Sequence, residues 1–123
     1  MTARLVIADD SSSILAMIVL SVRRDGYEPV TATDGLQALE AIREHRPALV
    51  ILDAMMPGAT GYEVCKTLRD DPDGPKPYVI MITAGGRASD RQNAEDAGVD
   101  EFFTKPFSPS ELRGRVRAIL GDP

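Results

Sequence analysis

At residues 48–57 the sequence reads ALVILDAMMP, in which the apolar run LVIL ends at Asp53. The run is bounded by Pro47 on one side and by Pro57 on the other. An uninterrupted apolar stretch between turn signals is typical of a strand that is buried on both faces in the middle of a parallel sheet. Asp53 is therefore expected at the carboxyl end of a central strand, which is where open α/β sheets bind ligands.

Length and composition predict one acidic domain, residues 1–123, with a core of about residues 4–120. The chain has a formal net charge of −5, so it lacks the basic field that holds nucleic acid phosphates or an anionic membrane surface. Its one cysteine, Cys65, cannot form an internal disulfide, and the N-terminus has no signal-peptide pattern, which favours the cytoplasm. The longest apolar run, residues 14–20, is shorter than the roughly 20 residues needed to span a membrane.

A strand followed by a one-sided helix recurs along the whole chain. We expect strands at residues 4–8, 28–32, 49–53, 78–83 and 101–104. We expect a first helix with its N-cap among the serines at 11–13 and its end near residues 25–26. Further helices are expected at 36–46, 61–69 and 89–97, and from Pro109 with Ser108 as its N-cap. Alternation at this spacing predicts a parallel sheet covered by helices on both faces, which is a doubly wound α/β sandwich.

The helix at 89–97 is the weakest of those expected. Its apolar residues are Ala94 and Ala97, and it follows Gly85 and Gly86. A helix with so little to bury is expected to be held loosely, because tertiary packing supplies most of a helix's stability. We therefore predict that this part of the surface is mobile before any activating signal.

Five polar side chains fall at or just after the ends of different strands: Asp9, Asp10, Asp53, Thr83 and Lys105. Because the loops after parallel strands share one edge of a sheet, these side chains are expected to converge. Three carboxylates brought together repel one another unless a cation is bound or protons are retained. An all-oxygen site with few carboxylates suits Mg²⁺, which keeps waters and phosphate oxygens in its shell.

The same group has the parts needed for phosphoryl transfer. Asp53, on the central strand, is the expected nucleophile, while the metal, the Lys105 ammonium and the Thr83 hydroxyl would stabilise the transferring oxygens. Each residue also has a plainer interpretation: Asp9 and Asp10 as helix caps, Asp53 as a turn residue, and Lys105 as a surface ion-pair partner. Their combination at successive strand ends favours the chemical interpretation.

Five short motifs stand in order along residues 4–120: Ala8-Asp9-Asp10-Ser11, Leu52-Asp53-Ala54-Met55-Met56-Pro57, Gly61, Ile82-Thr83-Ala84 and Lys105-Pro106-Phe107. Together they resemble the receiver domains of bacterial two-component response regulators, the CheY-like family. The resemblance implies a (βα)5 sandwich with a five-stranded parallel sheet in the flavodoxin-like order 2-1-3-4-5.

The resemblance also implies roles for individual residues. Asp53 would accept a phosphoryl group from a phosphohistidine on a sensor histidine kinase or a histidine phosphotransfer protein. The groups that would hold Mg²⁺ (or Mn²⁺) are Asp10, Asp53, the backbone carbonyl of Met55 and, through water, Asp9. The groups that would bind the phosphoryl oxygens are Thr83 and Lys105. The protein would then be a phosphoacceptor switch rather than a turnover enzyme.

The resemblance further implies that the response appears on a surface formed by the fourth helix, the fifth strand and the fifth helix. Phe102 occupies the family's switch aromatic position and would rotate when Thr83 is drawn toward the phosphoryl group. Phe102 and Phe103 alternate across a strand, so we expect one of them in the core and only the other as a switch. The signal would pass to a downstream protein or to a C-terminal output domain outside this segment.

Two other protein classes share part of this pattern. A hydrolase of the haloacid dehalogenase type also places an aspartate nucleophile after a buried strand, but it carries a second aspartate two residues later, where this chain has Met55. A receiver-like interaction module that is never phosphorylated would be expected to lose part of the acidic pair, Asp53, Thr83 or Lys105, and all of these are present. Incubation with acetyl phosphate and Mg²⁺ separates the three classes.

Overall fold

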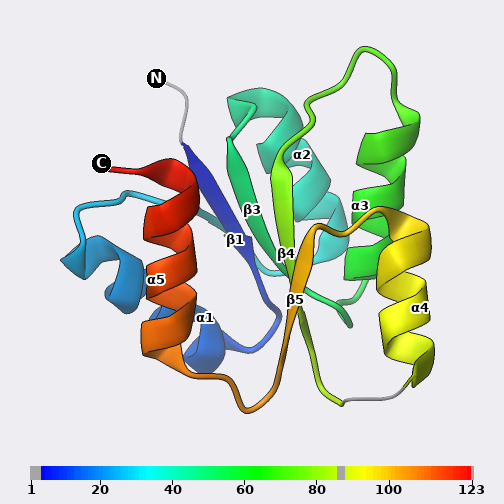
Figure 1. The fold of residues 1–123 in the computed structure, drawn as a ribbon. Coiled ribbons are helices and arrows are strands. Elements are labelled where there is room, and N and C mark those ends of the chain that lie inside the picture. Colours follow the sequence, from blue (N-terminus) through cyan, green and yellow to red (C-terminus); the bar gives the residue numbers. More distant parts are fainter. Residues whose placement is uncertain (1–3, 86–87, 123) are drawn as a thin grey trace.

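The computed structural model describes residues 4–85 and 88–122, which form a parallel sheet between two layers of helices (Figure 1). The strands are β1 (Leu5–Ala8), β2 (Val30–Ala32), β3 (Leu49–Asp53), β4 (Tyr78–Thr83) and β5 (Glu101–Thr104). The helices are α1 (Ser12–Arg24), α2 (Gly35–His45), α3 (Gly61–Asp70), α4 (Ala88–Ala97) and α5 (Pro109–Leu120). The strand order is β2-β1-β3-β4-β5 with parallel neighbours, so the predicted doubly wound fold and its strand order are confirmed.

An apolar core lies on each side of the sheet. Helices α1 and α5 cover one face, and α2, α3 and α4 cover the other (Figure 1). Alternate residues of the central strands enter different cores: Val6 and Val50 pack on the side of α2 and α3, whereas Ile7 and Ile51 pack on the side of α1 and α5. Because β1 and β3 are buried on both faces, they read as continuous apolar runs in the sequence.

Polar N-caps fix the starts of four helices. The side chains of Ser11, Asp34, Thr60 and Ser108 each accept a hydrogen bond from a backbone N–H in the first helical turn. Pro109 is the first residue of α5, as predicted. Each capped helix begins close to the end of the strand before it, so the caps hold the chain near the carboxyl edge of the sheet.

The predicted boundaries need one correction. Strand β2 begins at Val30 rather than at residue 28, because Pro29 has no N–H to offer to a neighbouring strand. The other strands and helices α2, α3 and α4 start and end within one residue of the prediction, and α1 and α5 begin directly after predicted caps, Ser11 and Ser108. Gly86 lies outside the described residues. Among the described residues, no helix combines the length and the apolar character that a membrane span requires.

Phe102 and Phe103 of β5 point to opposite faces of the sheet. Phe102 packs against the core under α2, α3 and α4, and Phe103 packs against the core under α1 and α5. Both side chains are half-buried. The prediction that only one of them belongs to the core is therefore wrong, because β5 has an apolar core on each of its faces.

Candidate functional site

The carboxyl ends of the strands meet at the lower edge of the sheet in Figure 1. Asp53 is the last residue of β3 and pairs in register with Ile82 of β4. Asp9 and Asp10 follow directly after β1. One carboxylate oxygen from each of Asp9, Asp10 and Asp53 lies within 4.8 Å of the other two. The predicted convergence of these three carboxylates is confirmed.

Lys105 carries its ammonium group into the same cluster. Its Nζ lies 3.4 Å from Asp53 Oδ1 and 3.7 Å from Asp9 Oδ2. The backbone N–H of Lys105 donates to the carbonyl of Thr83 over 2.7 Å. This hydrogen bond ties the end of β5 to the end of β4, so four strand ends contribute to one acidic cluster with a single lysine.

The cluster carries more negative charge than Lys105 balances. Asp9 and Asp53 are almost completely buried, with 1% and 5% of their surface exposed. Burial, and then repulsion from Asp9, raises the pKa of Asp53 from 3.8 to about 6, although the Lys105 ammonium and a backbone hydrogen bond from Met55 act in the opposite direction. A bound cation would therefore lower the free energy of the ionised cluster.

The donor set fits a hard divalent cation such as Mg²⁺. Asp9 Oδ2 is buried and accepts no hydrogen bond from the described residues, while Asp9 Oδ1 accepts one from the Ser11 N–H at 2.8 Å. The side-chain donors of the cluster are carboxylate oxygens, which Mg²⁺ prefers. Asp10 is exposed, so the cluster is open to solvent on that side and can accept a ligand.

Thr83 ends β4 beside this cluster and is buried. Its hydroxyl donates to the carbonyl of Gly85 over 3.2 Å. The hydroxyl is therefore engaged with the chain that leaves β4. A charged acceptor beside Asp53 would compete for this donor, because hydrogen bonds to ionised oxygens are stronger than those to neutral carbonyls.

The loop between β3 and α3 follows Asp53 and is fixed mainly through its backbone. The N–H of Ala54 donates to the Ile82 carbonyl at 2.8 Å, and the Ala54 carbonyl accepts from the Gly61 N–H at 2.8 Å. Met56 is buried, whereas Met55 is 64% exposed. A Cβ on Gly61 would lie 2.3 Å from the Asp53 carbonyl, so glycine at 61 permits this close approach of α3 to the strand end.

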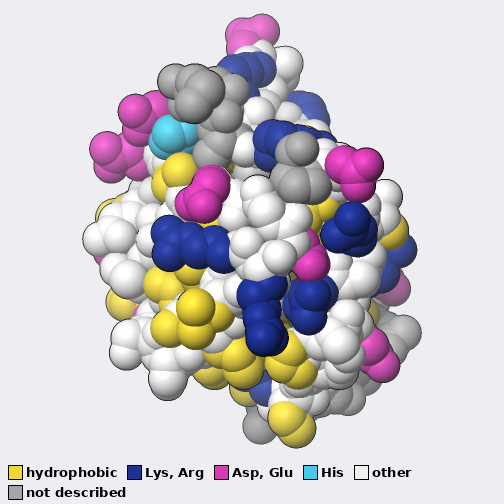
Figure 2. Space-filling model, turned by 90° about the vertical axis from the view of Figure 1, so that its left-hand side faces the viewer, with side chains coloured by type: hydrophobic (Ala, Val, Ile, Leu, Met, Phe, Trp, Pro, Cys, Tyr) yellow, Lys and Arg dark blue, Asp and Glu magenta, His cyan; other side chains and the backbone are white. Residues whose placement is uncertain are grey.

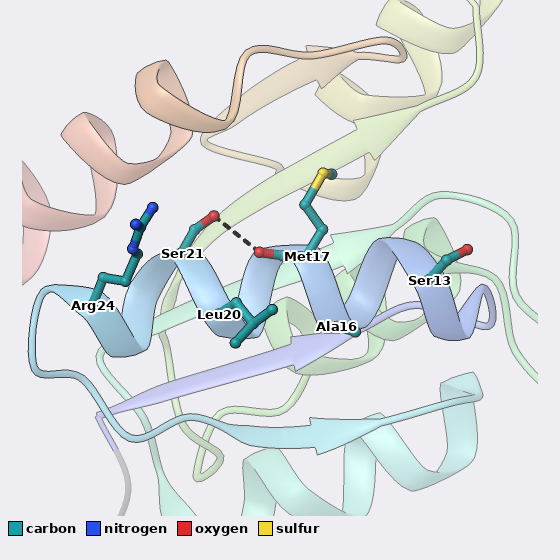
Figure 3. Close-up of a pocket in the computed structure, with 6 residues that line it drawn as sticks. All are labelled: Ser13, Ala16, Met17, Leu20, Ser21 and Arg24. Carbon is teal, nitrogen blue, oxygen red and sulfur yellow. Dashed lines mark hydrogen bonds between the residues drawn. The ribbon is translucent and has the colours of Figure 1, made fainter.

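A shallow hollow on the outer face of α1 was not singled out from the sequence. It is lined by Ser13, Ala16, Met17, Leu20, Ser21 and Arg24 (Figure 3). Met17 and Leu20 are exposed, and the Ser21 hydroxyl turns back to the Met17 carbonyl at 2.9 Å. In Figure 2, which shows this side of the molecule, hydrophobic side chains lie next to lysines and arginines. None of the residues that line the hollow carries a carboxylate, a thiol or an imidazole, so the hollow offers no group suited to bind a divalent cation or to act as a nucleophile.

Comparison with known proteins agrees with this geometry. The family model described as the response regulator receiver domain matches residues 5–117. The chain is 41% identical over 120 residues to the DNA-binding response regulator MtrA of Mycolicibacterium paratuberculosis, and the match covers 98% of this chain and 52% of that protein. The chain spans about half the length of the curated relatives it matches.

Solved structures share the complete fold. A putative response regulator from Chloroflexus aurantiacus has a TM-score of 0.87 at 36% identity, with 98% of each chain covered. The BeF3-activated receiver domain of DrrB, a Thermotoga maritima protein, has a TM-score of 0.83 at 29% identity, again with 98% of each chain covered. The similarity therefore extends over every strand and helix of this chain.

Proposed function

The chain belongs to the family of response regulator receiver domains, and from this membership we propose that it is a phosphorylation-controlled switch whose phosphoryl acceptor is Asp53. The observation that carries the proposal is the cluster of Asp9, Asp10 and Asp53 within 4.8 Å, with Lys105 Nζ 3.4 Å from Asp53 Oδ1. A carboxylate that ends a central strand, next to an ammonium group and two more carboxylates, is suited to attack phosphorus when a divalent cation is bound.

Mg²⁺, or Mn²⁺ in its place, would be held by this chain's oxygens at the acidic cluster. The proposed ligands are Asp10, Asp53, the backbone carbonyl of Met55 and, through water, Asp9. The bound ion would supply positive charge that offsets the charge of the phosphoryl oxygens. The hydrogen bond between Asp53 and the Met55 backbone keeps the loop that offers this carbonyl in contact with the acceptor residue.

Phosphoryl transfer would proceed by attack of an Asp53 carboxylate oxygen on the phosphorus of a phosphohistidine. A P–O bond forms as the P–N bond breaks, and the imidazole leaves with its own protein. The Lys105 ammonium, already 3.4 Å from Asp53 Oδ1, would bind a phosphoryl oxygen and stabilise the charge that gathers there. The product would be an aspartyl phosphate on the chain itself. The hydrolase alternative would pass through the same product, but this chain has Met55 where that class carries its second aspartate, so the proposed role is that of a switch.

The switch would begin at Thr83. Its hydroxyl now donates to the Gly85 carbonyl, and a phosphoryl oxygen on Asp53 would be a stronger acceptor. Movement of Thr83 would leave space for Phe102, which lies in register with Met81 on the neighbouring strand, to rotate inward. The change would then appear on the surface of α4, β5 and α5, where a partner reads it.

The partners follow from the chemistry and from the relatives. The phosphoryl donor would be a sensor histidine kinase or a histidine phosphotransfer protein. Because the chain spans about half the length of the curated relatives, the receiver would act either on a separate target protein or on an output domain in the same polypeptide. With a net charge of −5, this segment is not expected to bind nucleic acid itself, and we place it in the cytoplasm.

The direct test is incubation with acetyl phosphate and Mg²⁺, followed by intact mass measurement. The wild type is expected to gain one phosphoryl group. Asp53→Asn is expected to gain none, whereas Asp73→Asn, a matched change at an exposed loop residue, should react like the wild type. An unmodified wild type would instead support an interaction module, and continuous release of phosphate from many esters would support a hydrolase.

A stability measurement ensures that the Asp53→Asn result is not a folding defect. The folded-state pKa of Asp53, about 6, lies above its reference value of 3.8, so ionising this group as the pH rises between those values destabilises the folded protein. Asp53→Asn removes that repulsion and should raise the free energy of unfolding in EDTA at about pH 7, by about 1–3 kcal/mol. Mg²⁺ should then stabilise the wild type more than the variant.

A further inference from the structure

The loop between β3 and α3 is held from outside by the first residue of α2. The N–H of Gly35 donates to the carbonyl of Pro57 at 3.1 Å, and the same carbonyl accepts from the Ala59 N–H at 3.0 Å. The approach is very close: a Cβ on Gly35 would lie 2.0 Å from the Ala59 carbonyl oxygen and 2.7 Å from Ala59 Cβ. The obstructing atoms are mostly backbone, so they have no side-chain rotamer through which to withdraw.

Glycine at 35 has no other structural explanation. It is the N1 residue of α2, and it is not among the glycines with positive φ, which are Gly26, Gly58, Gly98 and Gly121. Alanine is normally better than glycine inside a helix, because glycine loses more conformational freedom on folding. The residue is therefore explained by the contact with the loop.

Two neighbours of Gly35 strengthen the contact. Asp34 caps the helix, with its Oδ1 accepting from the Gln37 N–H at 2.7 Å, and so fixes where α2 begins. The exposed Leu36 side chain lies over Gly58, with Cγ 3.4 Å from the place where a Cβ of Gly58 would be. The start of α2 thus meets the loop through one backbone hydrogen bond and two steric contacts.

The loop that Gly35 holds at Pro57 carries the Met55 carbonyl, and the Met55 backbone is also tied to Asp53 by a hydrogen bond. The Met55 carbonyl is a proposed metal ligand, yet the Met55 side chain is 64% exposed and gives the backbone little packing. Ala54 is fixed by β4 and α3, and Met56 by burial in the core. The next fixed point along the chain is the Pro57 carbonyl, which Gly35 holds.

We propose that Gly35 is a positioning residue for the divalent cation: by clamping the loop at Pro57, the start of α2 sets the orientation of the Met55 carbonyl. The inference rests on the proposed function, because it needs the cation to bind at the acidic cluster. Partners that hydrogen-bond directly to metal ligands usually contribute about 10–100-fold to metal affinity. Gly35 acts one step further out, so we expect an effect at the lower end of that range. Gly35 touches neither the metal nor the phosphoryl group and acts through the loop.

The test is Mg²⁺ titration of Gly35→Ala in the whole 123-residue chain, monitored by amide chemical shifts and by calorimetry. The added methyl must displace the loop, so the Mg²⁺ dissociation constant is expected to rise about tenfold. Two alanine variants in α5 serve as controls. Val116→Ala removes buried methyl groups from the opposite core and lowers the urea midpoint. Gly114→Ala, with open space around its Cβ, raises it. Both should bind Mg²⁺ as the wild type does.

The outcomes are distinct. A Mg²⁺ dissociation constant of Gly35→Ala within about twofold of wild type would overturn the positioning role, as would an equal loss in Val116→Ala. If Gly35→Ala does not fold, Asp34→Ala loosens the same helix start without a clash, and it should weaken Mg²⁺ binding measurably. An unchanged dissociation constant in Asp34→Ala would then overturn the inference. Failure of the wild type to bind Mg²⁺ would instead contradict the proposed function.

Discussion

The helices before and after the edge strand β5 are attached to the molecule very differently. Helix α5 buries Leu112, Val116 and Leu120 against the sheet. It is also tied along its length by side-chain interactions, namely Arg113 with Asp25, Arg115 with Glu101, Arg4 with the carbonyls of Leu120 and Asp122, and Tyr27 with the Gly121 carbonyl. These contacts hold the middle of α5 and its C-terminal end.

Helix α4 has weaker attachments over its described side chains. Its buried apolar residues are Ala94 and Ala97, which remove little apolar surface from water. The contacts that hold it act at its C-terminal end, where Arg69 of α3 donates to the Gly98 carbonyl at 3.0 Å and to Asp100 Oδ2 at 2.8 Å. Figure 1 shows α4 at the side of the molecule, next to α3.

The difference suggests which way a signal at β5 would travel. Phe102 faces the core under α2, α3 and α4, whereas Phe103 faces the core under α1 and α5. Rotation of Phe102 would therefore act on the side of the lightly attached helix, while α5 keeps its place. We expect α4 to move most and α5 to serve as a fixed reference for a partner that binds both.

Amide exchange gives the largest expected difference between the two helices. Amides near the end of α4, at residues 94–97, should exchange at least about 100-fold faster than those of α5 at residues 116–120, because local opening exposes less apolar surface in α4. Hydrogen exchange followed by mass spectrometry or NMR measures both helices in one sample. If the amides of α4 were as well protected from exchange as those of the central strands β3 and β4, the conclusion that α4 is held more loosely than α5 would be wrong.

Truncation of one buried side chain in each helix should give unequal losses of stability. Leu112→Ala in α5 leaves a cavity in a closely packed core and is expected to cost about 2–5 kcal/mol. Ala97→Gly in α4 removes one methyl group and helix propensity, at about 1 kcal/mol. Urea unfolding measures both free energies. Equal losses would mean that α4 contributes as much to the core as α5 does.

Removal of the Arg69 side chain tests the C-terminal attachment of α4. Arg69→Ala deletes hydrogen bonds to Gly98, Asp100 and the Pro77 carbonyl, and should cost about 1–3 kcal/mol. The more specific expectation is faster amide exchange in α4 with no change in α5. Arg43→Ala, at an exposed position of α2, is the control for loss of an arginine. Faster exchange in both helices would show a global effect instead.

The sequence predicted most of the site because strand ends are easy to locate. β1, β3 and β4 are continuous apolar runs, so the positions of Asp9, Asp53 and Thr83 at one edge followed from the parallel topology alone. Lys105 could be included in the same way, since it follows the short run of β5. The distances between these side chains and the raised pKa of Asp53 could not be predicted in this way, because both depend on how the folded chain buries the site.

Other features could not be read from local patterns. Arg113 and Arg115 look alike in the sequence as polar residues of an amphipathic helix, yet Arg113 pairs with Asp25, 88 residues away, and Arg115 pairs with Glu101. The role of Gly35 depends on how closely Ala59 approaches it. Such pairings are set by the packing of separate elements, and periodicity carries no information about them.

The smallest expected effect is the pH dependence of the stability that the ion pair between Asp25 and Arg113 gives to α5. A hydrogen bond from Arg113 lowers the pKa of Asp25 below its reference value of 3.8. A carboxyl group with a depressed folded-state pKa stabilises the fold above the unfolded pKa, and this contribution is lost as the pH falls through the folded-state pKa. Asp25→Asn should therefore have a lower melting temperature than the wild type at about pH 7. This difference in melting temperature should become smaller below about pH 4.

Melting curves of the wild type and of Asp25→Asn across this pH range, with Asp73→Asn as the control, measure the difference in melting temperature directly. High salt should reduce this difference in melting temperature further, because ion pairs near the protein surface are screened. Amide exchange in α5 should accelerate in Asp25→Asn, while exchange in α4, which makes no contact with this pair among the described residues, stays unchanged. A difference in melting temperature that is independent of pH would mean that Asp25 holds α5 through packing and not through its charge. Of the ion pairs that attach α5 more firmly than α4, the pair of Arg115 with Glu101 would then be the one that matters.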